Sequence, residues 1–193
     1  MDTPFAAGPV VALVGSAGGL PQVRQVLADL PAGLEVAVLV LLHQQPEREN
    51  QLAQLLQRGC ALPVQPAGDG EPLHGGAVTV APPGRHLVIA PDGCLAMIRS
   101  GPFPPSRPSA DLLLTSMGLG LGERAVAVIL SGDGNDGATG AAVVRRFGGR
   151  VVTIEPRAAD HPSMPRAVIE RGMVDEVLPL AVIGDWIAGR AAA

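Results

Sequence analysis

The sequence is poor in aromatic residues and in clustered basic residues, and each shortage excludes a class of function. Only 2% of its 193 residues are aromatic, and none is tyrosine, so aliphatic side chains must form the core. The 14 basic residues are outnumbered by 18 acidic ones and form no stripe with interleaved aromatics, which argues against nucleic-acid binding. No apolar run approaches the roughly 20 residues of a membrane-spanning helix, so we expect no membrane insertion.

Cysteine is also scarce. Cys60 and Cys94 are too few, and too far apart, to indicate a disulfide framework or a zinc site, and inert thiols in a reducing compartment are the simpler interpretation. The first residues lack the basic start and long apolar stretch of a secretory signal. We therefore expect a cytoplasmic protein that uses no metal and no cofactor.

What the sequence does contain is an alternation of short apolar runs and helical patterns, with 47% hydrophobic and 17% charged residues. The apolar runs are continuous, which is typical of strands covered on both faces in a parallel sheet. This rhythm predicts an α/β fold, with a doubly wound, mostly parallel sheet and helices on both faces. We expect one domain over residues 1–193, with a frayed tail at 191–193. The predicted strands are 10–14, 36–42, 125–130, 150–154 and 173–177, and the predicted helices lie near 23–30, 52–56, 110–119, 138–147, 165–171 and 180–190.

The middle of the chain has a different pattern. Residues 77–81, 86–90 and 94–98 are predicted to be short strands, the last two joined by a tight turn at 91–93. We interpret them as an antiparallel hairpin excursion at the edge of the sheet. Residues 101–108 contain four prolines and are predicted to form an irregular loop.

Polar residues follow three of the predicted strands. Ser16 follows 10–14 within a glycine-rich turn, His43 follows 36–42, and the loop 131–137 follows 125–130 and carries acidic residues. Because parallel strands end at the same edge of a sheet, these groups are expected to lie together. A serine, a histidine and a carboxylate are the groups that a hydrolytic triad needs.

Each of these groups also has a simpler interpretation. A serine before a helix is usually an N-cap, a histidine at a strand end is usually an ordinary hydrogen-bonded side chain, and the loop 131–137 could be plain turn chemistry. The chain offers other histidines too, namely His74, His86 and His161. We weigh the first two lower, because both lie in the predicted edge excursion.

Known motifs with similar residues do not fit. The turn at 15–19 is neither a G-x-G-x-x-G loop nor a P-loop. A calcium loop starting at Asp133 would have Gly137 and Val144 where ligands are required, so metal binding is disfavoured. Val14 occupies the first glycine position of the α/β-hydrolase elbow, so a serine hydrolase here would belong to another fold.

Five segments, in order, resemble the catalytic domain of the chemotaxis receptor methylesterase (CheB type). The resemblance implies hydrolysis of glutamate γ-methyl esters on chemoreceptor signalling helices, releasing methanol, together with deamidation of particular glutamines. It implies Ser16 as nucleophile, His43 as general base and acid and Asp136 as orienting carboxylate, with backbone N–H groups of Ala17 and Asp133 in the oxyanion hole. The segments are Val14-Gly15-Ser16-Ala17-Gly18-Gly19, Leu42-His43-Gln44-Gln45-Pro46, Arg107-Pro108-Ser109-Ala110-Asp111, Leu130-Ser131-Gly132-Asp133-Gly134-Asn135-Asp136-Gly137 and Met164-Pro165-Arg166-Ala167.

The chain departs from the family pattern in several places. The family normally carries an N-terminal receiver domain, whereas nine residues precede residue 10 here, so we expect no receiver domain in this chain. We expect either a stand-alone or excised catalytic domain, or control by a separate regulatory protein. Asp133, Ser106 and Pro156 stand where the family often has methionine, histidine and glutamate. An inward-facing Asp133 carboxylate would disfavour the oxyanion. These departures leave open a catalytically weak binding module that docks on a chemoreceptor or signalling partner, or an esterase for another substrate.

Overall fold

The structure of the protein, a computed structural model, describes residues 8–43, 51–100 and 106–191. Residues 192–193 of the predicted frayed tail lie outside the described residues, as do residues 101–105 of the predicted proline-rich loop. Residue 191 belongs to the last helix.

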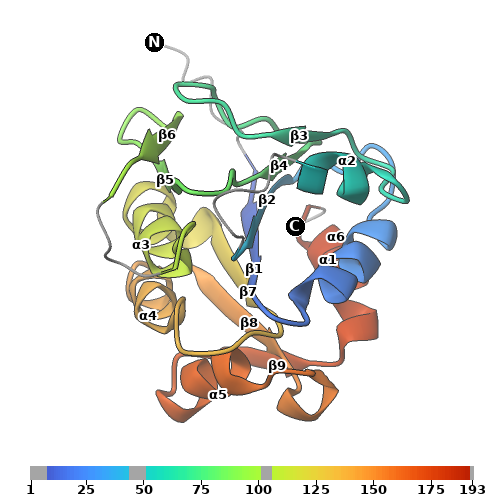
Figure 1. The fold of residues 1–193 in the computed structure, drawn as a ribbon, viewed down its shortest axis with the longest axis vertical. Coiled ribbons are helices and arrows are strands. Elements are labelled where there is room, and N and C mark those ends of the chain that lie inside the picture. Colours follow the sequence, from blue (N-terminus) through green and yellow to red (C-terminus); the bar gives the residue numbers. More distant parts are fainter. Residues whose placement is uncertain (1–7, 44–50, 101–105, 192–193) are drawn as a thin grey trace.

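A seven-stranded sheet forms the centre of the molecule (Figure 1), and all of its strand pairs are parallel. The spatial order is β3-β4-β2-β1-β7-β8-β9. This confirms the predicted doubly wound, mostly parallel α/β fold. The strands are β1 (Val10–Gly15), β2 (Ala37–Leu42), β3 (Val64–Pro66), β4 (Val78–Val80), β7 (Ala125–Ile129), β8 (Arg150–Ile154) and β9 (Glu176–Leu178).

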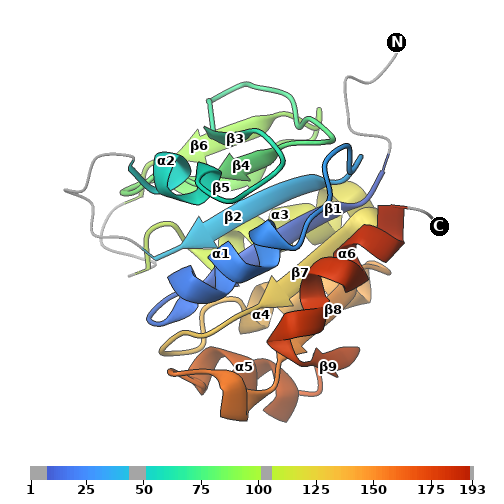
Figure 2. The same cartoon turned by 90° about the vertical axis from the view of Figure 1, so that its right-hand side faces the viewer.

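Helices cover both faces of this sheet (Figure 2). One face carries α1 (Gly19–Ala28), α2 (Gln51–Gln57) and α6 (Ile183–Ala191). The other carries α3 (Ala110–Leu121), α4 (Ala138–Arg146) and α5 (Ser163–Glu170). Three short 3-10 turns lie in the connections, at Gly122–Arg124, Pro156–Ala158 and Leu180–Val182.

The predicted hairpin is present as β5 (His86–Ile89) and β6 (Leu95–Ile98), which pair antiparallel in a separate two-stranded sheet. The segment 77–81 does not belong to that excursion. Its strand β4 lies inside the main sheet, parallel to both β2 and β3. Val78 and Val80 are buried in the core layer on one face of β4, and Thr79, whose side chain points to the opposite face, is buried too. The strand β3 had not been predicted.

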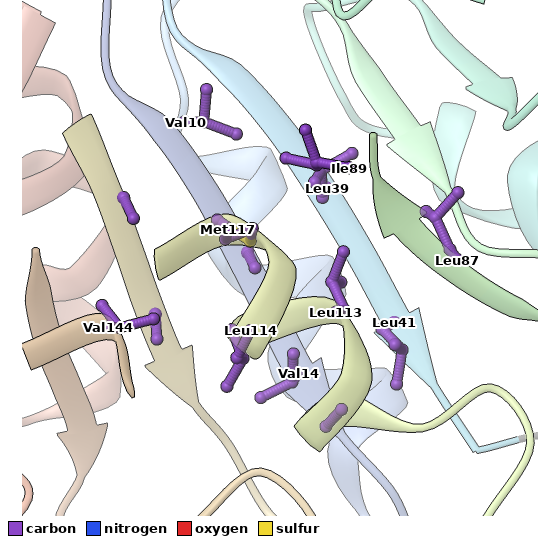
Figure 3. Close-up of a cluster of buried hydrophobic side chains, with 14 of the residues drawn as sticks. Val10, Val14, Leu39, Leu41, Leu87, Ile89, Leu113, Leu114, Met117 and Val144 are labelled. Atoms are coloured by element: carbon purple, nitrogen blue, oxygen red, sulfur yellow. The ribbon is translucent and has the colours of Figure 1, made fainter. Parts of the chain in front are cut away.

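The core explains why the strands are continuously apolar. Along β1, Val10 and Val14 face the cluster under α3, α4 and α5, whereas Val11 and Leu13 face the cluster under α1, α2 and α6. Burying a side chain of this size contributes about 1.5–3 kcal/mol, and alternate residues contribute to opposite layers. Figure 3 shows the first of these clusters, with Leu113, Leu114 and Met117 of α3 over Val14, Leu39 and Leu41.

The strand order reverses direction between β1 and β7. From β1 the chain proceeds outward to β2 on one side, and it later returns to begin the other half at β7. In open α/β sheets the crevice at such a point, outside the carboxyl ends of the strands, is the usual ligand site. Ser16, His43 and the loop 131–137 all follow carboxyl ends beside this reversal.

Candidate active site

Ser16 lies in the tight turn between β1 and α1. Its backbone N–H donates to the Ser131 carbonyl at 2.9 Å, and its own carbonyl accepts from the Gly19 N–H at 3.0 Å. The N-cap of α1 is Gly18, in the left-handed region at φ 72°, and no side chain caps this helix. The Ser16 hydroxyl makes no hydrogen bond to any described residue. The N-capping interpretation of Ser16 is therefore wrong.

The turn that carries Ser16 is held against the loop after β7. Ser131 is fully buried, and its hydroxyl donates to the Ala17 carbonyl at 2.9 Å and accepts from the His161 N–H at 3.0 Å. At Gly132 a Cβ atom would lie 2.9 Å from the Ser16 Cβ and would collide with the Met164 sulfur. Glycine is thus required for this loop to approach the backbone of Ser16 so closely.

His43 directly follows β2, beside Ser16. Gly15 and Leu42 are register partners, and the His43 N–H donates to the Gly15 carbonyl at 3.2 Å. Ser16 and His43 are therefore the next residues on neighbouring parallel strands, whose backbones run about 5 Å apart. No hydrogen bond joins the two side chains. Catalytic contacts are often long without substrate and shorten only when it binds.

Asp136 reaches His43 from the loop after β7. Its Oδ2 lies 2.8 Å from the His43 Nε2, and both side chains are mostly buried, at 13% and 17% exposure. An ionised carboxylate only accepts hydrogen bonds, so the proton of the neutral ring lies on Nε2. Nδ1 then keeps its lone pair, which makes it the ring nitrogen able to accept a proton.

The amino terminus of α3 holds the Asp136 carboxylate from the other side. The Ala110 N–H donates to Oδ2 at 2.7 Å, and the Asp111 N–H and the Ser109 hydroxyl each donate to Oδ1 at 3.0 Å. Burial alone would raise the pKa of Asp136, but the hydrogen bonds from His43, Asp111 and Ala110 outweigh it and lower the pKa. The carboxylate is thus kept ionised and fixed in orientation.

A second carboxylate, on α3, accepts hydrogen bonds from the start of α4 in the same way that Asp136 accepts them from the start of α3. Asp111, in the first turn of α3, accepts from the Gly137 and Gly140 N–H groups at the start of α4, at 2.9 and 2.8 Å. Burial raises the pKa of Asp111, and the neighbouring Asp136 adds to this, against the lowering effect of these hydrogen bonds. Helices α3 and α4 are consequently joined by reciprocal caps at the site.

Two backbone donors in the loops at the site are unengaged: Ala17 follows Ser16, and Asp133 follows Gly132, which lies against Ser16. Neither the Ala17 N–H nor the Asp133 N–H has an acceptor among the described residues. The carboxylate of Asp133 is 64% exposed and pairs with the Nδ1 of His161 at 2.9 Å. The Asp133 carboxylate is therefore mostly exposed to solvent, and it pairs with a histidine on the neighbouring loop.

Several residues that hold the site were assigned no role from the sequence. Ser109 and Asp111 lie before and inside a predicted helix, where S-x-D is an N-terminal signal, but nothing local indicated that this helix would meet Asp136. Gln22 of α1 accepts from the Ser131 N–H at 2.8 Å, a contact across more than a hundred residues. His74 is exposed, whereas His86 is fully buried.

The described residues contain neither a metal-binding cluster nor a membrane-spanning helix. Within the described parts of the chain, no group of three or more His, Cys, Asp or Glu side chains is arranged to bind a metal ion. Within the same residues, no helix has both the length and the apolar character needed to cross a membrane.

Comparison with known proteins places this chain in a family. Residues 11–187 match the CheB methylesterase family. The crystal structure of the Thermotoga maritima CheB methylesterase catalytic domain is similar, with a TM-score of 0.90 and 31% identity, covering 95% of this chain and 98% of that one.

Curated relatives give the same result. A protein-glutamate methylesterase/protein-glutamine glutaminase of Anaeromyxobacter dehalogenans is 40% identical over 94% of this chain and 53% of its own length. The protein-glutamate methylesterase FrzG of Myxococcus xanthus is 36% identical over 91% of this chain and 53% of its own. The chain spans about half the length of these relatives. It belongs to the CheB methylesterase family.

Proposed function

We propose that the protein hydrolyses glutamate γ-methyl esters on the signalling helices of methylated chemoreceptors, with Ser16, His43 and Asp136 as its catalytic triad. The observation that carries this proposal is the 2.8 Å contact between His43 Nε2 and Asp136 Oδ2, beside a Ser16 hydroxyl that no described residue engages. Its relatives named as protein-glutamate methylesterases support the same substrate class.

In the first half of the reaction, the Ser16 oxygen attacks the ester carbonyl carbon while the Nδ1 of His43 takes the hydroxyl proton. The carbonyl oxygen becomes an oxyanion, which accepts hydrogen bonds from the Ala17 and Asp133 N–H groups. Asp136 holds the imidazole ring by Nε2 and stabilises its positive charge. Methoxide leaves with the proton from His43 as methanol, and the glutamyl group remains esterified to Ser16.

In the second half, water replaces methanol. His43 removes a proton from the water as its oxygen attacks the acyl carbon, and then returns that proton to the departing Ser16 oxygen. The products are a glutamate carboxylate and the free serine. The same steps with a glutamine side chain release ammonia in place of methanol, which is the deamidation that a glutaminase performs.

Methanol release tests the proposal. The purified chain is mixed with a receptor fragment carrying methyl-labelled glutamate esters, and labelled methanol is counted over time. Wild type is expected to release methanol, and Ser16→Ala to lower the rate about 10⁴-fold or more without changing the circular dichroism spectrum. The control is Ser163→Ala, because Ser163 is an exposed serine at the start of α5, and it is expected to keep the wild-type rate.

The outcomes separate the other functions. Equal rates for wild type and Ser16→Ala would contradict the proposal. Receptor that is bound but releases no methanol would indicate the binding module. An inert receptor together with hydrolysis of other methyl esters in a panel would indicate an esterase with a different substrate.

A further inference from the structure

A buried histidine lies behind the site and takes no part in the proposed chemistry. His86 begins β5, in the hairpin that packs beside α3, and its side chain has no exposed surface. Both ring nitrogens are nevertheless hydrogen-bonded. Nδ1 lies 3.1 Å from the Ser109 N–H, and Nε2 lies 2.7 Å from the Ser100 hydroxyl oxygen.

These contacts fix the protonation of the ring. A backbone N–H can only donate, so the Nδ1 of His86 must carry a lone pair, and its single proton lies on Nε2, facing Ser100. A second proton would set an N–H group against the Ser109 N–H. Burial lowers the pKa of His86, and the nearby positive charge of Arg107 lowers it further, against the raising effect of Asp136. The ring is therefore neutral.

The partner of His86 is the residue that begins α3. Ser109 is 1% exposed, donates its N–H to His86, and donates its hydroxyl to Oδ1 of Asp136. The next two N–H groups of the chain also point at the same carboxylate. A displacement of the Ser109 backbone would therefore move three donors of Asp136 at once.

We propose that His86 is a positioning residue for the proposed triad: by accepting the Ser109 N–H it fixes the start of α3, and through Ser109 it sets the orientation in which Asp136 presents Oδ2 to His43. The hydrogen bonds run unbroken from Ser100 to His86, Ser109, Asp136 and His43. This inference rests on the proposed function, because the last member matters for rate only if His43 is the base.

Two substitutions separate the two ends of the ring. In His86→Asn the side-chain oxygen takes the place of Nδ1, so the acceptor for Ser109 is kept and the bond to Ser100 is lost. In His86→Gln the amide nitrogen takes the place of Nε2, so the bond to Ser100 is kept and the acceptor for Ser109 is lost. Both replace a buried ring by a shorter or narrower amide, so both are expected to lower the melting temperature.

Activity is expected to depend on whether the side chain at position 86 still accepts the Ser109 N–H, and not on the melting temperature of the variant. His86→Asn should keep kcat within about threefold of wild type, whereas His86→Gln should lose about 10- to 100-fold in kcat with KM within about twofold, as expected for misplacement of a catalytic group. Equal losses of kcat in the two variants, or a larger loss in His86→Asn, would overturn the proposal, since a purely structural role would track the melting temperature.

A spectroscopic readout is independent of turnover. The Nε2 proton of His43 that faces Asp136 gives a downfield proton resonance, identified by its loss in His43→Gln. It is expected at the wild-type position in His86→Asn and to be shifted or broadened in His86→Gln. An unchanged resonance in both variants would contradict the positioning role. If wild type itself releases no methanol, the proposed function fails, and this resonance still tests the geometry.

Ser109→Ala provides the decisive test if neither His86 variant folds. It removes the hydroxyl that joins Ser109 to Asp136, which also accepts from the Leu112 N–H as the N-cap of α3, and it leaves the backbone N–H to His86 in place. We expect kcat to fall about 3- to 30-fold with KM unchanged, the effect of losing one hydrogen bond to a charged group. An unchanged kcat and an unchanged His43 resonance would show that the connection through Ser109 does not exist.

Discussion

Asp136 accepts hydrogen bonds on both of its oxygens, and this limits what can replace it. Oδ2 accepts from the Ala110 N–H and faces the His43 Nε2, while Oδ1 accepts from Ser109 and the Asp111 N–H. An asparagine has only one such oxygen. An NH₂ group in place of Oδ2 would face the Ala110 N–H and the His43 Nε2, and in place of Oδ1 it would face the Asp111 N–H, so either orientation opposes a donor of α3.

Asp136→Asn is accordingly expected to affect both rate and stability. The wrong ring tautomer of His43 should lower methanol release about 10⁴-fold, by analogy with other triads. The mismatched donor at the start of α3 should cost about 1–3 kcal/mol in the free energy of unfolding, measured by urea titration.

The matched control for this substitution is Asp175→Asn. Asp175 accepts from the Val151 N–H and pairs with Arg145, on β8 and α4 and away from Ser16. It should lose some stability and keep the wild-type rate. A rate in Asp136→Asn as high as in this control would show that Asp136 does not orient the base.

At the level of single residues, Ser16, His43 and the loop 131–137 could be identified as site candidates from the sequence, because each directly follows an apolar strand. The sequence pattern could not identify His86 or Ser109 as parts of the site. Their contacts with each other and with Asp136 join residues more than twenty positions apart, across a hairpin and a helix that periodicity does not place. The resemblance to a family supplied the choice of Asp136 over Asp133.

At the scale of elements, the most regular strands were predicted within a residue or two because they are continuous apolar runs. β8 was predicted at Arg150–Ile154, as observed. β3, at Val64–Pro66, was missed because it has three residues, includes a proline and is only partly buried. β9 lies at Glu176–Leu178, later than predicted, because residues 173–175 are still part of the connection from α5. Short edge strands contain too few residues to show the apolar run or alternation from which a strand is predicted.

The contact between α3 and α4 depends on a small residue in α3. A Cβ atom on Gly118 would lie 2.9 Å from the Val144 nitrogen, a backbone atom that cannot move aside. On Gly120 of the same helix it would lie 3.8 Å from the nearest atom, a methyl group of Ile89. Because α3 also carries the donors of Asp136, the spacing of these two helices bears on the site.

Gly118→Ala and Gly120→Ala are therefore expected to have opposite effects. Gly118→Ala should lower the free energy of unfolding by about 1–3 kcal/mol, the usual cost of overpacking, and Gly120→Ala should raise it by up to about 1 kcal/mol through helix propensity. Urea unfolding of both variants measures this. Equal shifts of the same sign would show that α3 and α4 do not pack as closely as described.

At the scale of the whole molecule, the lowered pKa values of His86 and Asp136 should make stability fall with acidity in two steps, whereas the raised pKa of Asp111 acts in the opposite direction. The pKa of His86 is lowered in the folded state, mainly by burial, so its contribution is fully present above its unfolded pKa of about 6.5 and is lost as the pH falls below that value. The pKa of Asp136 is also lowered, so its contribution is lost only below its unfolded value of about 3.9.

Unfolding in urea at pH 7.5 and pH 5.0 isolates the first step. The wild type should be less stable at pH 5.0, because His86 takes up a proton in the unfolded chain at that pH and stays neutral in the folded chain. In His86→Asn that difference should shrink, since the remaining histidines are common to both proteins. A difference of the same size in both would mean that His86 is not held neutral in the fold.

If Ser16 is a nucleophile activated by His43 and Asp136, it should react with a fluorophosphonate probe, and this reaction can be measured without any receptor. The serine oxygen forms a bond to phosphorus, fluoride leaves, and the adduct is located by mass spectrometry of peptides. We expect one adduct, on Ser16, formed far more slowly in His43→Gln and in Asp136→Asn. An adduct on another residue, or one on Ser16 that forms equally fast without His43, would contradict it.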